Sequence, residues 1–487
     1  MKKLLRPDGL QVKSVTKDML PYAQSLTDDD NLLQKTGLRW ILAGMAILLL
    51  TTLWPVIYHL GIPLSRTLTA RLGGTAGTLA LFVGVIIFVR AVRPHGLLTP
   101  SQRFSIILWR ALLLLFLTVG IILGNSVVSA GREFLFLWML AEFLVAGVDD
   151  RFWFAIEKPL TVVFYVAVPF IFTYYETPML LVDPLGVYSH NVGQEGGRYT
   201  WSLAYQLRPL INFGLFLGVW GFVRPNGGIW RMAQMIAPIP YFIIDVGLFQ
   251  FRSVVFLLAV VVVSLLIFRP LLESRRRPAA TAILLAVCVG GLLIFVDSER
   301  YDVFKKRSFE ETAKESIFQS RLDELTAYQD DMGWEILVGR GLGGSFDASA
   351  VFSKHQASEE WGGVHFGILL FTLKGGVLLF VVFVAFMGRG FQLRPKAWYG
   401  NPCNLAAALF FPVIVIQLVL NPISATPVAL FKFLPVMMVL ARFGRRDDIV
   451  GKPMLQSAVF PATRLKAGAK LVMSDGKAVD SLPVVGN

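Results

Sequence analysis

Three basic side chains lie where an apolar run begins or where a loop helix is predicted. Arg252 lies at the start of FRSVVFLLAVVVV, Arg321 lies in SRLDEL, and His365 opens HFGILLF. A guanidinium binds a phosphate through two parallel N–H donors, and an imidazole takes up or releases a proton near neutral pH. These residues could therefore bind phosphate and transfer a proton. The alternative is an interfacial role, because an Arg or His at the end of a membrane span often only reaches the polar headgroups.

A glycine-rich turn, GRGLGG, surrounds Arg340. Gly341 and Gly343 lack a Cβ, so their backbone N–H groups can approach an anion closely, and Arg340 could add a bidentate guanidinium. The turn is not a Walker motif, because no Gly-Lys-Ser/Thr follows it. A glycine-rich segment after a helix is also simply a common turn, which is the alternative interpretation.

Two acidic residues, Glu359 and Glu360, lie just before His365 and are rival candidates for a general base. Exposed acids in a loop are usually only solvated, which is their ordinary interpretation. The loops contain no acidic metal-binding motif, and Cys288 and Cys403 do not have the spacing of metal ligands. We therefore expect no metal and no other cofactor.

The composition indicates an all-α polytopic membrane protein. Of the 487 residues, 55% are hydrophobic and 16% are charged, and the mean hydropathy is +0.61. Soluble proteins carry roughly 25% charged residues. The apolar residues come in blocks of about 20, the length at which a helix crosses a bilayer. The net charge of +13 does not predict nucleic-acid binding, because Lys and Arg that flank spans give the same excess.

The apolar blocks predict about twelve transmembrane helices. They form a transmembrane domain over 40–442, between a cytoplasmic N-terminal segment at 1–39 and a mobile cytoplasmic tail at 443–487. Lys and Arg cluster near 2–6, 90–103, 269–277, 389–396 and 442–446. All of these clusters face the cytoplasm when the spans are counted from a cytoplasmic N-terminus, as the positive-inside rule requires. The predicted spans are 40–61, 73–92, 104–124, 133–148, 157–175, 209–223, 230–248, 253–269, 279–297, 365–387, 403–420 and 426–442.

The same orientation places two long loops, 176–208 and 298–364, outside the membrane, with a helix predicted at 310–329. Within the spans, Arg110 and Glu142 fall at similar depths of neighbouring antiparallel helices, so we expect a structural ion pair. Asp245, near the outer end of its span, could be structural or functional. Pro238 and Pro240 predict a break in the span at 230–248.

The order of these motifs resembles the O-antigen ligase and O-antigen polymerase superfamily of bacterial membrane glycosyltransferases. The resemblance covers roughly 190–390. In that family an Arg opens a span, a second Arg lies in the next loop, a Gly-x-Gly turn follows, and a His opens a later span. Arg252, Arg321, the GRGLGG turn and His365 follow this order. Arg198, in GRY, is similar to an Arg that precedes a span. The chain departs from the family at Phe251, where Ser is usual, and at Phe366, where Asn is usual; no Trp follows Arg321 at the family's usual spacing.

The resemblance implies a GT-C type fold in the bacterial inner membrane, with the active site facing outward. The reaction would transfer a glycan, with inversion, from an undecaprenyl-diphosphate carrier to a sugar hydroxyl. Arg252 and Arg321 would hold the diphosphate, assisted by Arg198, Arg340, Gly341 and Gly343 as binding residues. His365, Glu359 or Glu360 would take the proton of the acceptor.

The acceptor could be a growing glycan or a lipid A core, because polymerases and ligases share these motifs. Polysaccharide-assembly proteins are therefore candidate partners. The alternative function is a transporter or flippase of a lipid-linked anion, which would favour broken helices and inverted repeats.

Overall fold

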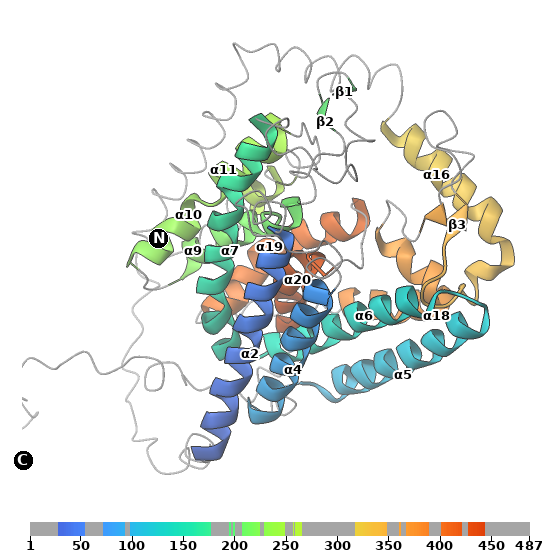
Figure 1. The fold of residues 1–487 in the computed structure, drawn as a ribbon, viewed down its shortest axis with the longest axis horizontal. Coiled ribbons are helices and arrows are strands. Elements are labelled where there is room, and N and C mark those ends of the chain that lie inside the picture. Colours follow the sequence, from blue (N-terminus) through green and yellow to red (C-terminus); the bar gives the residue numbers. More distant parts are fainter. Residues whose placement is uncertain are drawn as a thin grey trace, which may run out of the picture. The chain divides into compact units, whose positions relative to one another are not determined.

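The computed structural model is helical throughout most of the part that it describes (Figure 1). The exceptions are two antiparallel pairs of two-residue strands, β1 (Gln194–Glu195) with β2 (Arg198–Tyr199) and β3 (Phe346–Asp347) with β4 (Glu360–Trp361). The described residues are 28–53, 72–92, 98–176, 194–195, 198–199, 207–224, 228–248, 257, 259–264, 317–347, 360–361, 367–388, 401–420 and 427–443. The predicted tail at 443–487 lies outside this part of the chain except for its first residue.

Four of the described segments are long and apolar enough to cross a membrane, which supports the prediction of a helical membrane protein. They are Leu32–Thr52, Gly74–Val92, Pro100–Ile122 and Asp150–Ile171, and they lie in α2 (Asp28–Thr52), α4 (Gly74–Val92), α5 (Pro100–Ile122) and α7 (Asp150–Glu176). Between α5 and α7 lies α6 (Val127–Gly147). The count of twelve spans and the GT-C fold stay predictions.

The second half of the chain contains shorter helices. In order they are η4 (Arg208–Leu210), α9 (Gly214–Val223), α10 (Gly228–Ile236), α11 (Pro238–Phe242), η5 (Ile243–Leu248), α16 (Ile317–Met332), η8 (Gly333–Ile336), η9 (Gly367–Leu369), α18 (Leu370–Gly388), α19 (Pro402–Leu420) and α20 (Ala429–Arg442). The predicted break at Pro238 is confirmed, since α10 ends at Ile236 and α11 begins at Pro238. The predicted loop helix at 310–329 is confirmed over 317–329 by α16, which extends to Met332; its first residues, 310–316, lie outside the described part of the chain.

The first membrane helix begins and ends earlier than predicted. α2 runs over Asp28–Thr52, whereas the sequence analysis placed a span at 40–61. Pro55 explains the end of the helix, because proline removes an N–H donor and disfavours the α conformation of the residue before it. The remainder of the predicted span, 54–61, lies outside the described residues.

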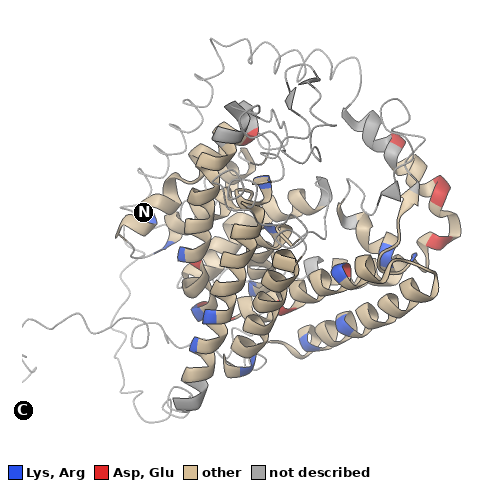
Figure 2. Ribbon diagram, viewed as in Figure 1, with Lys and Arg blue, Asp and Glu red and all other residues tan. Residues whose placement is uncertain are grey.

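Charged residues are sparse on the described helices, apart from acidic residues on α16 (Figure 2). The predicted ion pair between Arg110 and Glu142 is confirmed, with 2.5 Å between Nη2 and Oε1. Asp245, whose role the sequence left open, accepts two hydrogen bonds from Arg208, at 3.0 and 3.1 Å. Because a buried carboxylate requires a charged partner, this contact gives Asp245 a structural role.

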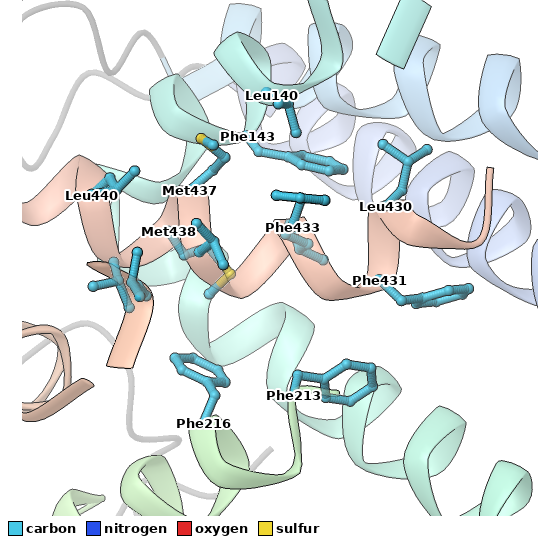
Figure 3. Close-up of a cluster of buried hydrophobic side chains, with 14 of the residues drawn as sticks. Leu140, Phe143, Phe213, Phe216, Leu430, Phe431, Phe433, Met437, Met438 and Leu440 are labelled. Carbon is cyan, nitrogen blue, oxygen red and sulfur yellow. The ribbon is translucent and has the colours of Figure 1, made fainter. Parts of the chain in front are cut away.

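One part of the hydrophobic core lies between α6 and α20 (Figure 3). Phe143 of α6 and Phe433 and Met437 of α20 lie within it, and Phe216 of α9 lies nearby in the same cluster. The rings of Phe136 and Phe433 meet edge to face, with centroids 5.5 Å apart. Such apolar contacts anchor the helices that carry the candidate site.

α2 and α4 pack through facing glycines. A Cβ on Gly84 would lie 2.5 Å from the backbone N of Ile41, and one on Gly44 would lie 2.5 Å from the N of Leu81. Both distances are too short for a real Cβ. Small residues of this kind allow membrane helices to approach closely.

We therefore expect Gly84→Ala to lower thermal stability in detergent. Overpacking costs about 1–3 kcal/mol, which exceeds the roughly 1 kcal/mol that alanine adds to a helix. Gly131→Ala in α6 is the matched control, because a Cβ there has no neighbour within 4 Å. Equal melting temperatures for the two variants would show that α2 and α4 do not pack in this way.

Candidate functional site

The glycine-rich turn after α16 and η8 is hydrogen-bonded to three helices, α5, α6 and α18. The Leu342 N–H donates to the Phe116 carbonyl of α5 at 3.0 Å, and the Arg340 N–H donates to the Leu373 carbonyl of α18 at 2.8 Å. The Gly343 N–H donates to the Glu133 carboxylate of α6 at 2.7 Å. The turn is therefore held in place by its own backbone.

The glycines of this turn are required by conformation and by space. Gly339, Gly341 and Gly343 have φ of +75°, +75° and +82°, which L-residues with a Cβ rarely adopt. A Cβ on Gly341 would lie 2.4 Å from Gly120 of α5. The packing interpretation of these glycines thus has direct structural support, whereas anion binding by Gly341 and Gly343 stays a prediction.

α18 is broken where the turn meets it. Gly375 (φ −145°, ψ 20°) and Gly376 (φ +61°, ψ −164°) have non-helical backbones. The break frees the Leu373 carbonyl, which accepts the Arg340 N–H, and the Val377 N–H, which donates to the Leu337 carbonyl at 3.2 Å. The loop therefore satisfies backbone groups that the helix leaves unpaired, as an apolar environment requires.

A buried ion pair lies beneath the turn, and the sequence analysis missed it. Lys374, only 1% exposed, precedes the break in α18 and contacts Glu133 of α6, with 2.8 Å between Nζ and Oε1. Lys374 Nζ also donates to the Gly344 carbonyl, while the other Glu133 oxygen accepts the Gly343 N–H. Lys374, the one charged residue within the apolar run that forms α18, was the signal that a buried acidic partner should exist.

Arg340 binds groups of its own loop. Its Nε donates to Glu335 at 2.6 Å, and its Nη1 donates to the Asp331 carboxylate at 2.6 Å and the Ser345 carbonyl at 2.7 Å. Although burial favours the neutral form, these hydrogen bonds and charges raise the pKa of Arg340. Arg340 therefore fastens the turn to the end of α16, and an anionic ligand would have to compete with two carboxylates for it.

A small second core joins α16 to α18. The Tyr328 hydroxyl of α16 lies 2.7 Å from Thr372 Oγ1 of α18, and the Tyr328 ring meets Phe346 of β3 edge to face. Burial raises the pKa of Tyr328, so its hydroxyl stays protonated. β3 in turn pairs with β4, with Asp347 opposite Glu360. The loop helix, the second strand pair and the start of α18 are thereby connected.

The predicted site residues differ in how far the structure describes them. Arg321 lies in α16, Arg198 in β2 and Glu360 in β4, and for these the described structure is the backbone alone. Arg252, Glu359 and His365 lie outside the described residues. Among the candidates, Arg340, Gly341 and Gly343 are those with described contacts.

Comparison with known proteins gives no relative from which a function could be transferred. No protein-family model matches the chain, and no curated protein matches it. Any functional interpretation must therefore rest on the residues of the site.

Proposed function

We propose that this chain is an inverting membrane glycosyltransferase that transfers a glycan from an undecaprenyl-diphosphate carrier to a sugar hydroxyl. It would act as a surface or exopolysaccharide polymerase or as an O-antigen ligase. Its place would be the bacterial inner membrane, with the loops at 176–208 and 298–364 on the outer side.

The observation that supports the proposal is that elements carrying separate sequence motifs contact one another. They meet at the small core that joins α16 to α18. α16 carries Arg321, and its Tyr328 contacts Thr372 of α18, the helix that follows His365 in the chain. The strand that contains Glu360 pairs with the strand that follows the glycine-rich turn. Elements bearing candidate phosphate-binding and proton-accepting residues are thus connected to a turn that hydrogen bonds tie to three helices, and a preorganised site requires support of this kind.

The chemistry follows from the residue types. An acceptor hydroxyl attacks the anomeric carbon, the bond from that carbon to the phosphate oxygen breaks, and the carrier diphosphate leaves with the electron pair. Arg252 and Arg321 would stabilise the negative charge that develops on the diphosphate. His365, Glu359 or Glu360 would accept the proton of the hydroxyl.

A transporter of a lipid-linked anion is the second candidate. Helices broken inside the membrane are typical of secondary transporters, and both α18 and the segment 228–248 are broken. In α18, however, two backbone groups at the break, the Leu373 carbonyl and the Val377 N–H, bond to the loop at Arg340 and Leu337 and are therefore already engaged. This favours the transferase.

Proteoliposomes containing the purified protein distinguish the two functions. With a lipid-linked oligosaccharide and an acceptor glycan, we expect a longer glycan and release of the carrier diphosphate, measured by mass spectrometry. Arg321→Ala protein is the negative control. Movement of the lipid-linked oligosaccharide between leaflets without any new glycosidic bond would support the transporter and reject the transferase.

A further inference from the structure

Large apolar side chains project from the short segment between α16 and the glycine-rich turn. In η8 and the residues after it, Trp334 is 72% exposed, Leu337 65% and Val338 50%. Ile336, between them, packs on the core of Tyr328, Met332 and their neighbours. Large apolar residues grouped on a surface generally mark a contact site, and tryptophan is enriched where a membrane meets water.

The segment and the turn that follows it contact α18 and α5, and the contact with α5 lies before the C-terminal end of that helix. The Leu337 carbonyl accepts the Val377 N–H of α18, and the Leu342 N–H donates to the Phe116 carbonyl of α5. α5 ends at Ile122, so at a rise of 1.5 Å per residue Phe116 lies about 9 Å before that end. The glycine-rich turn therefore contacts α5 at a depth that the bilayer covers if α5 crosses it.

Exposed apolar side chains lie where α5 ends and α6 begins. Ile122, Leu123, Val127 and Val128 are between 61% and 80% exposed. Only a short polar turn separates the two helices, and its Asn125 side chain donates to the carbonyls of Arg340 and Leu342. The segment 334–338 therefore lies two residues along the chain from a turn that bonds to the α5–α6 connection, where the helix surface faces lipid if α5 and α6 span the membrane.

The backbone and charges of the segment also suit an apolar environment. The N–H groups of Leu337 and Val338 donate to the carbonyls of Trp334 and Glu335, and the Gly339 N–H also donates to Glu335. The Glu335 carboxylate is paired with Arg340. Lipid insertion requires such internal pairing, because hydrocarbon offers no hydrogen bonds.

We infer that residues 333–338 are inserted into the membrane leaflet at the α5–α6 turn, with Trp334, Leu337 and Val338 in contact with lipid. The long loop would then be partly a membrane-inserted segment, and the glycine-rich turn would lie within the depth of the same leaflet. This inference does not depend on the proposed transferase activity.

Spin labels test the insertion directly. Leu337→Cys and Val338→Cys are made in protein with Cys288→Ala; Cys403 is retained because it is buried. The labelled proteins are reconstituted into phosphatidylcholine–phosphatidylglycerol vesicles. Accessibility is measured with oxygen, which concentrates in lipid, and with a water-soluble nickel chelate. Leu115→Cys on the exposed side of α5 is the lipid reference, and Gln329→Cys on the exposed side of α16 is the water reference.

We expect both labels to resemble the Leu115→Cys reference, with high oxygen and low nickel accessibility. Nickel accessibility like that of Gln329→Cys at either position would overturn the inference. Low accessibility to both reagents would also overturn it, because it would show that protein and not lipid covers the segment.

Discussion

Arg321→Ala is expected to reduce glycan transfer by about 10²- to 10³-fold, the scale seen when one donor to a developing negative charge is removed. The proposed reaction separates a diphosphate from the anomeric carbon, so the charge on that leaving group grows as the bond breaks. Initial rates with a purified lipid-linked donor, at saturating donor and acceptor, measure the effect. Binding of the donor should weaken less than the rate falls if the guanidinium acts mainly in the transition state.

Arg321→Lys distinguishes bidentate phosphate binding by a guanidinium from a general effect of positive charge. A guanidinium offers two parallel donors to a phosphate, whereas an ammonium is a point charge, so we expect lysine to restore little of the rate. Gln329→Ala is the matched control, because Gln329 is an exposed residue of the same helix. Full activity in the lysine variant, or equal losses in the Arg321 and Gln329 variants, would remove Arg321 from the proposed site.

Sequence reasoning succeeded where a single physical rule applied within one segment or between two neighbouring helices. The Arg110–Glu142 pair followed from the depth of each charge in its helix, because a buried charge requires a partner. The break at Pro238 followed from the missing N–H of proline. The same rule applies to α2, which ends at Thr52. The predicted span at 40–61 does not take account of Pro55.

The arrangement of the candidate site could not be predicted in the same way. A glycine that lets backbone approach an anion and a glycine that lets backbone approach another helix look identical in a sequence. Gly341 lies against Gly120, more than two hundred residues earlier in the chain. The pairing of Glu133 with Lys374 is equally distant, and the break at Gly375 and Gly376 depends on a loop that supplies the missing hydrogen bonds. Such contacts require the tertiary structure.

Lys374→Met is expected to destabilise the protein by roughly 3–5 kcal/mol, the usual result of leaving one member of a buried ion pair without its partner. Glu133 would remain as a carboxylate among apolar helices, still bound to the Gly343 N–H but without its cation. The loss of the ammonium also removes a donor to the Gly344 carbonyl. We therefore expect the glycine-rich turn to loosen from α6 and α18, and peptides covering 337–347 to exchange hydrogen for deuterium faster. Unfolding by SDS and hydrogen exchange in detergent measure the two effects.

The double variant Glu133→Gln/Lys374→Met should recover much of the stability. Glutamine is neutral, yet its carbonyl oxygen can still accept the Gly343 N–H, so no charge stays buried alone. Arg110→Met is the comparison, because it breaks another buried ion pair of α6, the one between Arg110 of α5 and Glu142, without touching the turn. It should lower stability and leave exchange at 337–347 unchanged. A double variant no more stable than Lys374→Met, or faster exchange in Arg110→Met as well, would show that the turn is not held by the Glu133–Lys374 pair. Another interaction would then have to hold the glycine-rich turn in the proposed site.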